Sequence, residues 1–195
     1  MGRSDDDSAA YGELIDALRD LQDAVAASAP DRVQASPLTA ALRRTADELR
    51  CAGTDPALRR FGRLDVTGRG QTMCPPLLIT HLGAERLRGT LAFTAFHGGF
   101  GEHAHGGAVA MVMNEVMGTL ANVSPSIVRV AAFVHVNYRS AVPLGAVLQV
   151  RADVSELAGR KQTVAASLVN GQRTLADGEG LFLSLPPAVP GPARC

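Results

Sequence analysis

The residue pattern with the clearest chemical meaning is a His-Gly-Gly triplet, His105-Gly106-Gly107, followed by an apolar segment that reaches about residue 122. Apolar residues cover nearly the whole circumference of this segment, which predicts a helix that is buried on most sides. Two glycines at a helix start expose backbone N–H groups, which can stabilise a developing negative charge together with the helix dipole. The triplet therefore predicts a site that polarises a carbonyl oxygen or binds an anion.

A second chemical signal is the polar pair Asn114-Glu115 near the middle of the same helix. Polar side chains in an apolar helix need a partner or a function, because burying them unpaired costs free energy. Consecutive side chains point about 100° apart around a helix, so the two residues face different surroundings. We expect Asn114 to line the site. We expect the Glu115 carboxylate to lie at an interface or to form an ion pair. Alternatively, it acts as a base.

Four histidines outside the triplet are weaker candidates. His97 and His103 flank the glycine-rich loop that leads into the helix, and we expect them at the surface, although either could act as a base. His81 and His135 fall within strand patterns and are expected to be structural.

Composition excludes several classes of protein. The chain has 195 residues with 19 basic and 19 acidic side chains, so its formal net charge is zero and it offers no electrostatic footprint for nucleic acid or an anionic membrane. No apolar run approaches the ~20 residues of a membrane span, and no signal peptide is apparent. Three scattered cysteines give neither a disulfide framework nor a metal-ligand spacing. We therefore expect a cytoplasmic protein that binds no metal and no cofactor.

The first part of the chain predicts a helical extension over residues 1–58. Residues 1–8 are polar and are expected to be disordered, with Ser8 capping a helix over 9–27 that carries an apolar stripe. Ser36-Pro37 offers a cap and a first-turn proline for a second helix that ends near Arg50. This pair of helices is expected to pack on the core or on a partner subunit.

Residues 59–187 predict a second domain rich in strands, followed by a flexible tail at 188–195. Alternating patterns or short turns mark strands over 77–82, 87–96, 130–139, 147–154, 162–169 and 175–185, and Asn170-Gly171 is a hairpin signal. Because no other helix is apolar all round, a curved antiparallel sheet must wrap the helix that follows the triplet. The predicted class is α+β with the hot-dog fold and an N-terminal helical extension.

The motif series over residues 75–185 resembles the phenylacetate-pathway-type acyl-CoA thioesterase family of the hot-dog superfamily. The resemblance rests on the triplet, on the segment Val136–Gly145 with its Tyr-Arg and Val-Pro-Leu-Gly, on Gly159-Arg160-Lys161, and on Leu175–Phe182. A lone His-Gly-Gly is common at helix starts, whereas these motifs in this order and spacing are fairly specific.

The resemblance implies hydrolysis of acyl-CoA thioesters at an interface between two subunits, in a dimer or a dimer of dimers. The N–H of Gly106 would polarise the thioester carbonyl, His105 would shape the loop, and Gly107 would contribute to the substrate site. A carboxylate on the helix of the other subunit would act as base or nucleophile. Arg139, Arg160 and Lys161 would hold the phosphates of CoA.

The sequence departs from the family pattern at two positions. The Asp or Glu expected nine residues after the histidine is Asn114, and the Asn or Gln expected six residues before it is Gly99. An amide has no useful basicity, although it can orient a water molecule. Two further hypotheses therefore stand beside the thioesterase: a non-catalytic acyl-CoA or acyl-ligand binding protein with a degenerate site, and, less well supported, a hot-dog dehydratase or related acyl-chain enzyme.

Overall fold

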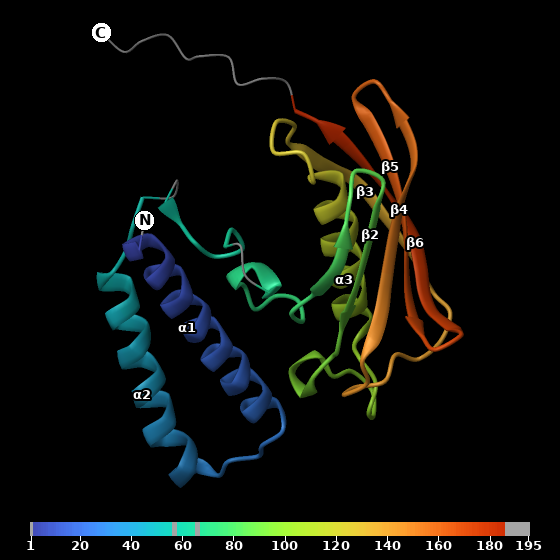
Figure 1. Cartoon of the computed structure of the whole chain (residues 1–195). Coiled ribbons are helices and arrows are strands. Elements are labelled where there is room, and N and C mark those ends of the chain that lie inside the picture. The colour runs from blue at the N-terminus through green and yellow to red at the C-terminus, as the bar shows by residue number, and fades with distance from the viewer. Residues whose placement is uncertain (1, 56–57, 65–66, 186–195) are drawn as a thin grey trace, which may run out of the picture. The chain divides into compact units, whose positions relative to one another are not determined.

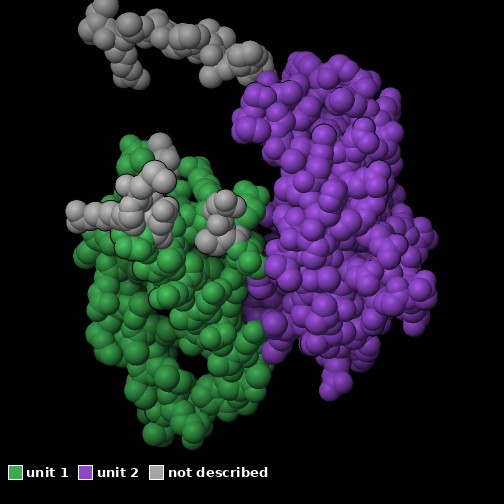
Figure 2. All heavy atoms as spheres, in the orientation of Figure 1, with its two compact units in different colours: residues 1–72 green, residues 73–195 purple. Residues whose placement is uncertain are grey.

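The computed structural model describes residues 2–55, 58–64 and 67–185. The chain forms two compact units, residues 1–72 and residues 73–195 (Figure 2). Residues 59–72 thus lie with the helical unit in this division. The domain boundaries at 58/59 and 187/188 stay predictions, and the tail expected at 188–195 lies outside the described residues.

Unit 2 is one long helix packed against a curved antiparallel sheet, which confirms the hot-dog fold (Figure 1). The helix is α3 (Gly106–Ala121). The sheet has the strand order β1-β2-β4-β5-β6-β3. Its strands are β1 (Leu78–Leu82), β2 (Arg86–Leu91), β3 (Arg129–Tyr138), β4 (Leu148–Ala158), β5 (Lys161–Asn170) and β6 (Arg173–Ser184). Short turns join β4 to β5 and β5 to β6, with Gly159 and Gly171 at positive φ, as the turn signals predicted.

The core of unit 2 lies between α3 and one face of the sheet. α3 buries Val109, Val112, Met113, Val116, Met117 and Leu120 against alternating residues of β4, β5 and β6. On β4 these are Leu148, Val150 and Ala152, as the strict alternation of that strand predicted. Each large side chain removed from water in this way contributes about 1.5–3 kcal/mol, so the hydrophobic contact between helix and sheet fixes the position of α3.

Strand β3 forms an edge of the sheet and is less regular than its sequence suggests. Its register against β6 shifts between Ala131 and Phe133, so the single alternating face expected over 130–138 is interrupted there. In the described part of the chain β3 pairs only with β6. Val130 and Phe133 are 44% and 48% exposed. The free side of β3 is thus an apolar strand edge, which is suited to pairing with another strand.

Unit 1 contains two helices, α1 (Gly2–Ala26) and α2 (Arg32–Cys51), and both begin earlier than predicted. α1 includes residues 2–8, which the sequence indicated as disordered. The main-chain oxygen and the carboxylate of Asp7 accept hydrogen bonds from Arg60 at 2.6 and 3.3 Å, which ties this end of the helix to a distant segment. α2 is capped by Asp31 in a capping box with Gln34, so Ser36 is not the cap and Pro37 lies inside the helix.

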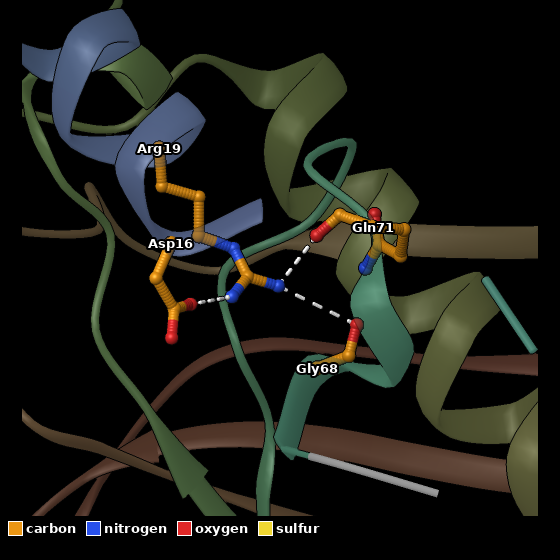
Figure 3. A network of polar contacts seen from close by, with 4 residues as sticks. All are labelled: Asp16, Arg19, Gly68 and Gln71. Atoms are coloured by element: carbon orange, nitrogen blue, oxygen red, sulfur yellow. Dashed lines mark hydrogen bonds and ion pairs between the residues drawn. The ribbon is translucent and has the colours of Figure 1, made fainter. Parts of the chain in front are cut away.

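Arg19 connects α1 to a short 3-10 turn, η2 (Thr67–Gly70), within unit 1 (Figure 3). Its guanidinium forms an ion pair with Asp16 at 2.6 Å and donates to the main-chain oxygens of Gly68 and Gln71. The side chain of Arg19 is only 15% exposed. Because charge-assisted hydrogen bonds are stronger than neutral ones, this network anchors the turn on the face of α1 that carries Arg19.

In the part of the chain that the structure describes, no helix combines the length with the apolar composition that a bilayer span requires.

Candidate active site

The start of α3 is built by His105, which is the N-cap of the helix. Its φ of −64° and ψ of 137° are those of extended backbone, and its ring Nδ1 accepts a hydrogen bond from the N–H of Gly107 at 3.0 Å. The carbonyl oxygen of His105 accepts from the N–H groups of Ala108 and Val109. The imidazole therefore presents an unprotonated Nδ1 to the helix, and its remaining proton lies on Nε2.

The two glycine amides differ in whether their N–H group donates a hydrogen bond. Gly107 donates to His105, whereas within the described parts of the chain no acceptor is found for the N–H of Gly106. A Cβ at Gly107 would lie 3.0 Å from Nδ1 of His105, so glycine at this position lets the ring approach the amide. The free N–H of Gly106 points out of the helix end, where the helix dipole also favours negative charge.

Tyr138, the last residue of β3, holds the peptide group on the other side of Gly106. Its hydroxyl donates to the carbonyl oxygen of Gly106 at 2.9 Å, and its ring lies 3.6 Å from the place where a Cβ on Gly106 would stand. The sequence motif included Tyr138, but no role was inferred for it. The contact joins an edge strand to the helix start and restricts the orientation of Gly106.

The loop that precedes the helix is held by close backbone contacts. The N–H of Gly99 donates to the carbonyl of His103 at 2.8 Å, and the N–H of His105 donates to the carbonyl of His97 at 2.8 Å. A Cβ at Gly99 would lie 2.9 Å from the Cα of His105, and real Cβ atoms do not approach backbone that closely. A residue with a side chain would not fit this backbone at position 99, which accounts for a glycine there.

His97, where this loop begins, is buried and not at the surface as expected from the sequence. Its Nδ1 lies 3.2 Å from the main-chain N and 2.8 Å from the hydroxyl of Thr94. Its ring also makes edge contacts with Phe93 and Phe96. His103, in contrast, is exposed. His97 therefore supports the loop that positions His105.

Asn114 lies on the one exposed stripe of α3. Gly107, Met111 and Asn114 recur at spacings of four and three residues, so they share a helix face, and all three are exposed. Asn114 is eight residues beyond Gly106, or about 12 Å along the helix axis. The two groups of one chain are thus too far apart to act on the same atom.

Glu115 lies on a neighbouring face of α3 and is half-buried. The pKa of the Cys74 thiol is raised to about 12, first by burial and second by the negative charge of Glu115. The carboxylate is therefore close enough to the core at Cys74 to act on its ionisation. This surrounding differs from that of Asn114, as the 100° rotation between consecutive residues predicted.

We expect Cys74 to resist alkylation in the folded protein. Because its pKa is raised to about 12, the reactive thiolate is scarce at pH 8, and the side chain is also buried. Cys51 is exposed and should react. Mass spectrometry of peptides after treatment with iodoacetamide at pH 8 measures both, and denatured protein gives the fully alkylated reference. Equal labelling of the two cysteines in the native state would contradict the burial of Cys74.

The three basic residues predicted to hold phosphates lie at opposite ends of the sheet. Arg139 forms a two-point ion pair with Asp177, at 2.6 and 3.0 Å, which raises the pKa of Arg139 and lowers that of Asp177. Arg160 donates to the carbonyl of Ser184, and Lys161 pairs with Leu183 on β6. Asp177 and Leu183 are about 20 Å apart along that strand. One chain therefore does not bring Arg139 into a cluster with Arg160 and Lys161.

Metal-ligating side chains do not gather at this site. Over the described residues there is no group of three or more His, Cys, Asp or Glu side chains that could hold a metal ion.

Comparison with known proteins agrees with this architecture. The sequence model of the thioesterase superfamily matches residues 101–176, which include the end of the loop, α3, strands β3 to β5 and the start of β6. No curated protein sequence matches the chain significantly.

Solved structures show the same fold. The thioesterase superfamily protein RHA08564 is 23% identical, with 89% of this chain and 90% of that chain covered and a TM-score of 0.76. The conserved protein PA5202 of Pseudomonas aeruginosa is 28% identical over 56% of this chain and 88% of its own, with a TM-score of 0.52. The protein smu.793 of Streptococcus mutans, solved bound to acetyl-CoA, is 14% identical over 56% and 88%, with a TM-score of 0.53.

Residues 101–176 are thus similar to the sequence model of the thioesterase superfamily, and the chain shares its fold with a solved thioesterase superfamily protein. At the level of that superfamily, thioester hydrolysis is the general activity that the fold suggests.

Proposed function

We propose that this protein hydrolyses acyl-CoA thioesters to a free acid and CoA. The observation that carries the proposal is the N–H of Gly106, which is free at the start of a buried helix while His105 occupies the next amide. Such a fixed donor stabilises the charge that develops on a carbonyl oxygen during attack. The acetyl-CoA bound to smu.793, which shares the fold, supports a CoA ester as substrate.

In the proposed reaction the thioester oxygen accepts a hydrogen bond from Gly106. The oxygen of a water molecule attacks the carbonyl carbon, and negative charge moves onto the oxygen that Gly106 holds. The C–S bond then breaks as the C=O bond re-forms, and the CoA sulfur leaves with a proton while the carboxylic acid retains the water oxygen. Asn114 orients the attacking water, and the proton of that water passes to a base and from the base to the departing sulfur.

We propose that the site is completed by a second copy of the chain. Asn114 stands about 12 Å from Gly106 of its own helix, so a shared site requires Asn114 of a partner. The exposed stripe of α3 and the free edge of β3 lie on unit 2 without a cover from that unit. A two-fold axis beside β3 would pair the two strands and place each Asn114 near the other chain's helix start.

The same arrangement suggests how CoA is held. In an antiparallel pair of subunits, Arg160 and Lys161 of one copy approach the end of the sheet where the other copy carries Arg139. Charged phosphates could then be bound by residues from both copies. Arg139 would act through its exposed guanidinium edge while Asp177 fixes its orientation.

Of the polar pair on α3, Asn114 fits the water-positioning role better. Glu115 acts electrostatically on the buried Cys74 and is itself half-buried. A direct chemical role for Glu115 stays a prediction, as does a cytoplasmic location.

A second candidate function is the binding of acyl-CoA without hydrolysis. The observation that favours it is the amide at position 114, because an amide cannot accept the proton of the attacking water. This candidate keeps the free amide of Gly106 and the shared site, but it predicts that the substrate is released unchanged.

Purified full-length protein assayed with acyl-CoAs of increasing chain length tests both candidates. Release of free CoA thiol, followed with a thiol reagent, should be saturable and well above the rate without enzyme. Calorimetry with the same esters measures binding independently. Saturable binding without turnover would reject the thioesterase and favour the non-catalytic binding protein. If neither binding nor turnover is measured, both candidate functions are rejected.

We expect Tyr138→Phe to lower kcat by about fivefold with little change in KM. The variant removes one hydrogen bond to the carbonyl of Gly106, worth about 1 kcal/mol, while the ring remains. Steady-state kinetics on the preferred ester measures the effect, and the thermal midpoint checks that the fold is intact. A rise in KM at constant kcat would show that Tyr138 contacts the ground-state substrate instead.

A further inference from the structure

The hairpin of α1 and α2 exposes an apolar stripe that unit 1 does not cover. On α1 the stripe consists of Leu14, Leu18, Leu21 and Val25, with spacings of four, three and four residues. These four side chains lie within about one sixth of the helix circumference. Leu14 and Leu18 each remain 40% exposed. These leucines are exposed, although their spacing is that of core residues in a helical bundle.

Alanines extend the apolar surface of α1 on one side of the leucine stripe. Ala10, Ala17 and Ala24 recur every seven residues beside the leucine stripe, and all three are exposed. On the opposite flank, Arg19 contacts Gly68 and Gln71 of unit 1, and Ile15 is buried. A line of alanines next to leucines lets another helix approach closely.

α2 carries a matching stripe and has no buried residue at all within its bounds. Leu38, Leu42 and Leu49 share one face and are 44–56% exposed. An isolated helix of this length is only marginally stable in water, and helices in proteins are stabilised chiefly by packing their apolar face. The apolar face of α2 therefore lacks the packing partner that its sequence pattern predicts.

The charges of the two helices indicate which molecule supplies this contact. Residues 6–26 of α1 hold six carboxylates and one arginine, whereas α2 holds four arginines and two carboxylates. The two helices run in opposite directions and are joined by residues 27–31 (Figure 1). If two such hairpins meet about a two-fold axis, the acidic α1 of each can lie over the basic α2 of the other.

We propose that the α1–α2 hairpin is a self-association module whose partner is the hairpin of a second copy, so that the two form an antiparallel four-helix bundle. The spacing of four and three residues is the pattern that packs helices at the shallow angles of such bundles. The proposal does not depend on the thioesterase activity, and it gives the chain an association surface separate from β3.

The mass of the full-length protein in solution tests the proposal. Light scattering and sedimentation equilibrium are compared for the wild type and for Leu18→Gln/Leu42→Gln. The wild type should have twice the mass of the variant at low micromolar concentration, unless β3 joins the same two copies, in which case the masses agree and the variant dimer dissociates at a higher concentration. The dissociation constant of this step should rise by about a hundredfold or more, because two leucines lose their burial at the interface.

Val33→Gln is the matched control. Val33 is 80% exposed and lies on the face of α2 opposite Leu42, so this variant should keep the wild-type mass. Circular dichroism establishes that helix content is retained. If the leucine variant loses helix content, the same measurements are made on Ala17→Gln/Ala24→Gln. These two alanines are exposed and glutamine favours helix, so this variant should stay helical and associate more weakly than the wild type. Equal masses together with equal dissociation constants for the wild type and a helical variant would overturn the proposal, as would loss of association in Val33→Gln. Turnover is measured separately, so an inactive protein leaves this test intact.

Discussion

Gly106→Pro is expected to lower kcat for thioester hydrolysis by about 10²–10³-fold, the effect of removing one oxyanion donor. Proline has no backbone N–H, so the substitution deletes the donor itself, which no other residue can do at a main-chain position. The neighbouring amide cannot replace it, because the N–H of Gly107 is bonded to the ring of His105.

The backbone at this position accepts proline. Gly106 is the first residue of α3, where the amide has no partner within the helix and proline is favoured. His105 precedes it with a ψ of 137°, the extended conformation that proline requires of its neighbour. A Cβ at Gly106 stands 3.6 Å from the ring of Tyr138, which is an ordinary contact. The thermal midpoint should therefore change little.

Gly106→Ala is the matched control, because it adds the same Cβ and keeps the N–H. It should retain most of the wild-type kcat. Single-turnover kinetics on one acyl-CoA separates chemistry from binding for the three proteins. If Gly106→Pro folds and turns over as fast as Gly106→Ala, the amide of Gly106 is not the electrophilic donor, and the mechanism proposed for this site is wrong.

Asn114→Asp is expected to raise kcat by about 10²-fold or more. A carboxylate at this position can accept the proton of the attacking water, and general base catalysis contributes about 10²–10⁴-fold. Asn114 is exposed on α3, so the change in charge is solvated in the free chain and the fold should tolerate it. The kcat of the variant should also fall at low pH, because only the ionised carboxylate is a base.

This substitution separates the two functions proposed for the chain. Turnover that appears only in Asn114→Asp identifies the natural protein as a binder that has lost its base. Turnover in the wild type that aspartate does not increase excludes the binding-only function and shows that the base lies elsewhere. Asn114→Ser serves as the control, since it removes the amide without adding a base.

Much of the fold could be predicted because its elements have strong local patterns. The apolar circumference of α3, the alternation of β4 and the glycines at the two hairpin turns each have one structural solution. Predictions were weaker where a pattern had several solutions. Ser36-Pro37 is a typical helix start, yet Asp31 and Gln34 form a better cap and the helix extends through Pro37. On β3 the shift of register near Ala131 could not be read from alternating residue types.

For the candidate site, too, some features could be predicted from the sequence and others could not. The triplet at 105–107 and the exceptional amide at 114 are visible in the sequence, because residue type and spacing alone define them. The sequence did not show that His97 is buried, since a histidine beside glycines is compatible with either environment. Nor did it indicate that Tyr138 binds the carbonyl of Gly106, because that contact joins residues 32 positions apart.

The sequence by itself thus determined the helix, the strands around it and the chemical groups available at the helix start, since these follow from local periodicity and residue chemistry. Only the tertiary structure decided which amide remains free. That outcome depends on the direction of the His105 ring and on the close approach of Gly99 behind it. It also placed Arg139 far from Arg160 and Lys161, because distances across a sheet are set by the register between strands and not by the order of residues.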